Sequence, residues 1–141
     1  MAGADPRGAV GLDTSVLIRL LIGLPPVQAS TAVDFIKKSR IAGRRVVVSD
    51  LVISEAYFAL HFHYEVPKPE AIAALREVLR SGLVEPADGP AAVEMLEESA
   101  RSSSKPGFVD RLIHAQYGRL PASMATFERA AGRLAGTTVL S

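Results

Sequence analysis

Four acidic side chains in this sequence stand where they could act together on a metal ion. Asp13 directly follows the short apolar run of residues 9–12, and Glu55 and Asp110 interrupt apolar segments near the starts of predicted helices. Glu128 follows a fourth predicted strand. A carboxylate rarely enters apolar surroundings alone, because an unpaired buried charge is costly and shifts its own pKa instead. A divalent cation is a partner that several carboxylates can share, so the pattern predicts an acidic metal site.

Each of these residues also has a purely structural interpretation. Asp13 is a good helix N-cap ahead of Thr14, and Asp110 suits the first turn of a helix through the helix dipole. Glu55 could pair with an arginine, and Glu128 could be an ordinary surface acid. We interpret the other acidic residues named here as a solvated face: Asp34, Glu65, Glu70, Glu77, Glu94, Glu97 and Glu98.

Short β-branched or apolar runs alternate with helical periodicity along the chain, which predicts the elements that would position these acids. The predicted strands cover residues 9–12, 45–49, 83–85, 122–126 and 137–140. The predicted helices cover residues 14–24, 30–40, 51–63, 70–80, 90–100 and 108–117, with a polar loop at 101–107 and a short helix between the last two strands. Strands joined through helices imply right-handed crossovers. We therefore predict an α/β fold in which a parallel sheet of about five strands is flanked by helices on both faces.

Length and composition limit the classes of protein that remain. The chain has 141 residues, 48% of them hydrophobic, and its mean hydropathy is +0.21, which predicts one packed domain over residues 1–141. It has no cysteine, which excludes disulfides and thiolate metal sites. No apolar run is long enough to cross a bilayer and residues 1–6 lack a signal-peptide layout, so we expect a cytoplasmic protein with no membrane partner. The net charge of +1 means that a nucleic acid would be held by local basic clusters and metal ions.

The chain resembles the PIN-domain ribonucleases, and within them the VapC-like toxins of toxin–antitoxin pairs. The matching segments cover residues 11–17, 54–56, 108–115 and 124–128, in the order and at about the spacing that the family has. The resemblance implies an endoribonuclease that uses Mg²⁺ or Mn²⁺, with Asp13, Glu55, Asp110 and Glu128 as metal-binding and catalytic residues. It also implies a small antitoxin that covers the cleft. One departure is Glu128, because the family usually has Asp there and the longer side chain affects a second metal position.

Other side chains have candidate supporting roles. Thr14 and Thr126 could orient the carboxylates or a nearby water, or serve only as capping and strand-end hydroxyls. Arg101 and Lys105, in the loop before Asp110, are candidate RNA contacts.

The remaining chemistry-bearing residues have structural interpretations that we favour. The three histidines, His61, His63 and His114, are expected to be structural, and the basic stretch at residues 37–45 could be a solvated surface. We assign Phe108 and Phe127 to the core. A homodimer is expected because the apolar content of residues 52–64 exceeds one helical stripe.

Two other functions stay open on sequence grounds. A metal-impaired PIN-like module could bind RNA or a protein without cutting it. This alternative stays open because Glu128 stands where the family usually has Asp. A phosphotransfer enzyme could use Asp13 as a nucleophile, but the second acid expected two residues later is replaced by Ser15. The single-stranded regions of RNA are the expected target of the nuclease, because phosphate contacts supply affinity and exposed bases supply specificity.

Overall fold

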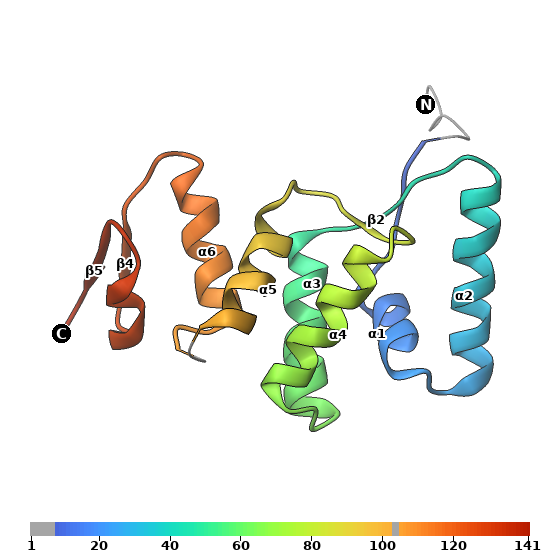
Figure 1. Ribbon diagram of the computed structural model, residues 1–141, viewed down its shortest axis with the longest axis horizontal. Coiled ribbons are helices and arrows are strands. Elements are labelled where there is room, and N and C mark those ends of the chain that lie inside the picture. The colour runs from blue at the N-terminus through green and yellow to red at the C-terminus, as the bar shows by residue number, and fades with distance from the viewer. Residues whose placement is uncertain (1–7, 103–104) are drawn as a thin grey trace. The chain divides into compact units, whose positions relative to one another are not determined.

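The computed structural model describes residues 8–102 and 105–141, which belong to two compact units, Met1–Gly89 and Pro90–Ser141 (Figure 1). Both units combine helices with parallel strands, so the predicted α/β class is confirmed. Residues 1–6, in which no signal-peptide layout was found, and residues 103 and 104 of the predicted polar loop lie outside the described residues.

The first unit is a three-stranded parallel sheet with its connecting helices. Its elements are β1 (Val10–Gly11), α1 (Thr14–Ile22), α2 (Pro26–Ile41), β2 (Val46–Val48), α3 (Asp50–Phe58), the π-helix η1 (Ala59–His63), α4 (Lys68–Arg80) and β3 (Glu85–Pro86). The strands lie in the order β1-β2-β3, with Val10 opposite Val46 and Val47 opposite Glu85. The central strand has the buried valines Val46 and Val48, as its β-branched sequence predicts.

Helix α1 packs on α2, α3 and α4 through the fully buried Leu17. It ends at Gly23, whose left-handed backbone (φ 76°) closes the last turn. Helix α2 then begins at Pro26, four residues before the predicted start, because proline is well suited to the first turn of a helix while the apolar stripe starts later. Within the described residues no single helix could span a membrane. The pair α1 and α2 meets the length and composition requirement only together, with a bend of 111° between them.

The second unit has two helices followed by a two-stranded parallel sheet. Its elements are α5 (Ala91–Arg101), α6 (Phe108–Gly118), β4 (Met124–Thr126), the 3₁₀ helix η2 (Arg129–Arg133) and β5 (Thr137–Val139). Helix α5 packs against α6 through the buried residues Leu96, Phe108 and Leu112. Met124 pairs with Thr137.

The described strands are parallel, as the sequence predicts: three pair with one another in the first unit and two in the second. The alternation of strands and helices indicates parallel neighbours without specifying which strands share hydrogen bonds. The single-domain interpretation of residues 1–141 stays a prediction.

Candidate acidic site

Asp13 lies at the junction between β1 and α1, where it caps the helix. Its backbone is extended (φ −86°, ψ 175°), and its Oδ1 accepts hydrogen bonds from the Val16 N–H at 3.2 Å and the Ser15 hydroxyl at 2.6 Å. The cap satisfies one of the N–H groups that a helix start leaves without an intrahelical partner. Since the residue is exposed, the same carboxylate also faces solvent.

The local field keeps Asp13 ionised. The Ser15 hydroxyl lowers the pKa of Asp13 most, followed by the Val16 N–H, and Arg19 lowers it further by charge attraction. The Ser15 backbone N–H also lowers this pKa. The hydrogen bonds that cap the helix therefore also stabilise the charged form of an exposed carboxylate.

Glu55 is brought to the start of α1 by a bond between two helices. The Thr14 hydroxyl, on the first residue of α1, donates to Glu55 Oε1 at 3.1 Å across a separation of 41 residues. Helices α1 and α3 pack together, and Glu55 lies on the exposed side of α3 while its neighbour Ala56 is fully buried. The Glu55 carboxylate is therefore held by the residue that directly follows Asp13, at the start of α1.

Asp110 and Glu128 belong to the second unit. Asp110 is half-buried in the first turn of α6. Glu128 is exposed and stands at the N-cap position of η2, where its side chain makes no capping bond. Its backbone N–H donates to the Thr126 hydroxyl at 3.0 Å, so Thr126 holds the turn that presents Glu128.

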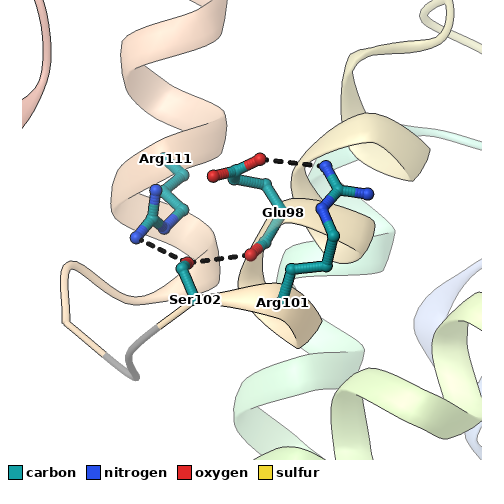
Figure 2. A network of polar contacts seen from close by, with 4 residues as sticks. All are labelled: Glu98, Arg101, Ser102 and Arg111. Atoms are coloured by element: carbon teal, nitrogen blue, oxygen red, sulfur yellow. Dashed lines mark hydrogen bonds and ion pairs between the residues drawn. The ribbon is translucent and has the colours of Figure 1, made fainter.

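The loop that leads to Asp110 is anchored by the next residue, Arg111, which is buried. Its Nε donates to the Pro106 carbonyl at 3.0 Å and its Nη2 to the Ser102 hydroxyl at 3.1 Å. Figure 2 shows the continuation of this network, in which Ser102 donates to the Glu98 carbonyl at 2.8 Å. Arg111 thus joins the end of α5 to the start of α6, and its role in the second unit is structural.

The two candidate RNA contacts have different surroundings. Arg101 forms an exposed ion pair with Glu98 at 3.0 Å on the same helix (Figure 2), whereas Lys105 is exposed on the loop before α6. An exposed pair of this kind contributes roughly 0–1 kcal/mol, so a phosphate could displace Glu98 at small cost.

Two of the histidines hydrogen-bond to backbone carbonyls, which is consistent with the structural role expected for them. His114 Nε2 donates to the Ala135 carbonyl at 2.6 Å, and His61 Nδ1 lies 3.0 Å from the Val66 carbonyl. Of the two phenylalanines assigned to the core, Phe108 is buried as predicted. The assignment of Phe127 is wrong: it is 73% exposed, because it lies in the turn after the short strand β4.

The donor set in the first unit fits a hard divalent cation. Carboxylate and hydroxyl oxygens are the ligands that Mg²⁺ and Mn²⁺ prefer, and Mg²⁺ in proteins commonly uses only one or two carboxylates together with waters and substrate phosphates. Asp13, Glu55 and Thr14 provide that minimum. In the described part of either unit, no group of three or more His, Asp or Glu side chains gathers around one point.

Sequence reasoning missed two charged residues of the first unit. Asp50, at the start of α3, is buried, and its N–H donates to an Asp88 carboxylate oxygen at 2.7 Å. Like Asp13, Asp50 comes shortly after a buried strand, and that signal could have identified it. From the sequence alone no role is assigned to Arg19, whose charge acts on Asp13.

Parallel strands joined through helices, with Asp13 at the carboxyl end of β1 and Glu55 bonded to the next residue, define the class: an α/β protein with acidic residues at one edge of its sheet. The family model of the PIN domain matches residues 10–136, and the chain therefore belongs to the PIN-domain family, a family of nucleases. No curated protein and no solved structure shows significant similarity to the chain.

The capping role of Asp13 can be separated from its charge. We expect Asp13→Ala to lower the free energy of unfolding by about 1 kcal/mol, because the cap of α1 is lost. Asp13→Asn should stay within about 0.5 kcal/mol of the wild type, because asparagine caps equally well. Urea unfolding followed by circular dichroism measures both. Equal stability of the alanine and wild-type proteins would show that the cap does not matter.

Proposed function

We propose that this protein is a divalent-metal-dependent endoribonuclease that hydrolyses RNA phosphodiester bonds. The observation that supports the proposal most is the bond that holds Glu55 to Thr14, the residue next to Asp13, in a chain of a nuclease family. Helix capping alone accounts for Asp13, but it gives no reason for an exposed glutamate of α3 to be held at the same helix start.

The residues of the first unit have defined roles in this proposal. Asp13 and Glu55 hold Mg²⁺ or Mn²⁺, and the Thr14 hydroxyl fixes the orientation of the Glu55 carboxylate. When bound, such an ion supplies activation of a water and neutralisation of charge on the phosphoryl oxygens. Asp110 and Glu128 are the further metal-binding and catalytic carboxylates, Thr126 positions Glu128, and Arg101 and Lys105 contact the RNA backbone.

The biological role belongs to the same proposal. The order and spacing of the four acidic motifs support the toxin of a toxin–antitoxin pair, with a small antitoxin as partner and the cytoplasm as its location. A homodimer is also proposed. The structure buries Ile53, Tyr57 and Leu60 inside the first unit but leaves Phe62 (71% exposed) and Tyr64 on its surface. These two aromatic residues are the surface that a second copy would cover.

The second candidate function is a PIN-like module that binds RNA or a protein without cutting. It is favoured by Glu128 in place of the usual aspartate. The described residues of each unit also contain no cluster of three acids. Cleavage assays separate the two candidates directly.

The first test of the nuclease is cleavage of a mixed single-stranded RNA pool. We expect Mn²⁺- or Mg²⁺-dependent cleavage that EDTA abolishes, and a loss of about 10²-fold or more in rate for Asp13→Asn and Glu55→Gln, because each change removes one negative charge from the cation site. Glu70→Gln, an exposed acid on α4, is the matched control and should cleave like the wild type. Undiminished cleavage by Asp13→Asn at equal metal concentration would contradict the proposed role of Asp13 in holding the metal ion.

The role of Glu128 is tested by calorimetric titration with Mn²⁺. We expect Glu128→Gln to weaken binding by about tenfold or more, because a negative ligand is lost, while Glu128→Asp keeps the charge and changes only the reach of the oxygens. Identical isotherms for the wild type and both variants would remove Glu128 from the proposed metal ligands.

The homodimer is tested by light scattering at high micromolar concentration. We expect a mass near twice the chain mass of 15.0 kDa, and a shift toward the monomer for Phe62→Ser, because the substitution removes exposed apolar area from the proposed contact. Val27→Ser, at an exposed apolar position on α2, is the control. A monomeric wild type across the whole concentration range would contradict the proposal.

A further inference from the structure

A groove between α1 and α2 begins beside the Asp13 cap and has no role in the site described above. Its volume is about 560 Å³, and its lining residues are Ser15, Val16, Arg19, Gln28, Thr31, Ala32 and Phe35. Ser15, at one end of the groove, is the residue whose hydroxyl bonds Asp13. Sites for small organic ligands typically enclose about 300–1,000 Å³, so the groove has room for a nucleotide.

A positioned cation lies in the wall of this groove. Arg19 Nε donates to Gln28 Oε1 at 2.8 Å, and Nη1 donates to the Ser15 carbonyl at 3.1 Å. Within the described residues, Nη2 has no hydrogen-bond partner and Arg19 makes no salt bridge. A guanidinium that is held by neutral groups keeps its full charge and retains donors for an anion, and its planar geometry matches phosphate.

The groove also has an apolar part, which lies on α2. Phe35 lies on α2 and is 44% exposed, so its ring is reachable from solvent while the helix holds it in place. Nucleobases stack on exposed aromatic rings with little dependence on sequence. Gln28 and Thr31 add polar side chains to the α2 side of the groove, where the Thr31 hydroxyl donates to the Val27 carbonyl at 3.0 Å.

We propose that the α1–α2 groove binds one nucleotide of single-stranded RNA, with its phosphate on Arg19 and its base against Phe35, adjacent to the phosphodiester held at Asp13. The choice of RNA as the ligand rests on the proposed function. It assigns Arg19 and Gln28 as positioning residues, because they touch the bound strand beside the reacting phosphate and not the phosphate that is cut.

The competing explanation is that Arg19 and Gln28 only join α1 to α2. The variant Gln28→Glu separates the two explanations. A glutamate at this position still accepts the Arg19 Nε–H bond, so a purely structural pair is preserved. The added carboxylate, however, neutralises the guanidinium and repels phosphate, so an RNA contact is lost.

The experiment measures binding of a fluorescein-labelled single-stranded oligoribonucleotide of mixed sequence by anisotropy, in EDTA so that no cleavage occurs. We expect Arg19→Gln and Gln28→Glu each to weaken binding about tenfold or more. The slope of log K against log salt concentration should become shallower by about 0.7, the value for one lost phosphate contact on a single strand. Phe35→Leu should weaken binding without changing the slope, because stacking carries no charge.

The matched control is Arg40→Gln, an exposed arginine near the end of α2 that gives the same change in net charge. It should bind like the wild type. Thermal melts report on folding, and Arg19→Lys, which keeps the charge but not the planar fork, provides a second variant if Arg19→Gln is unstable. Its affinity should fall while the slope is retained.

The outcomes distinguish the groove from the nuclease. Wild-type affinity and slope in folded Gln28→Glu and Arg19 variants would overturn the groove proposal while leaving cleavage by the acidic site intact. Loss of binding in these variants, in a protein that never cuts RNA, would support the groove and overturn the nuclease. A wild type that binds no RNA would overturn both.

Discussion

The hydrogen bonds that Asp13 accepts at the start of α1 are the contacts on which the first unit's site depends. They set the residue at which a buried strand becomes a helix, and therefore the positions of Thr14, Ser15 and Arg19 along the first turns of that helix. Thr14 then reaches Glu55 on α3, and Arg19 reaches Gln28 on α2. A single capped helix start thus organises the acidic pair and the neighbouring groove from three helices.

The capping role of Asp13 and its charge support each other. Oδ1 accepts the capping bonds, and these bonds also favour the charged form of the group. Structural and chemical interpretations of Asp13 are therefore compatible, and evidence for the cap does not argue against a role in metal binding.

In the second unit a buried arginine connects the end of α5 to the start of α6. Arg111 bonds the Pro106 carbonyl and the Ser102 hydroxyl, and so determines how the chain enters α6 just before Asp110 is presented in its first turn. Burying a guanidinium is costly unless its donors are satisfied, and here backbone and hydroxyl oxygens satisfy them. Local sequence patterns had no means of detecting these partners, because one of them lies nine residues away in a loop.

Local patterns were sufficient for the α/β class, the direction of the strands and the placing of Asp13 at a strand end, because β-branched runs, helical periodicity and capping residues act over a few neighbours. They also predicted correctly that Phe108, which lies in the apolar stripe of a helix, is buried. The prediction that Phe127 is buried was wrong, because an apolar side chain does not indicate whether the turn in which it lies is exposed. Only the tertiary structure decided that β1, β2 and β3 pair in that order in the first unit and that β4 pairs with β5 in the second. It also decided that Thr14 meets Glu55 across 41 residues and that Arg19 bonds Gln28 in a groove lined by α1 and α2. These features depend on which helix faces pack together, a non-local choice that no short segment contains.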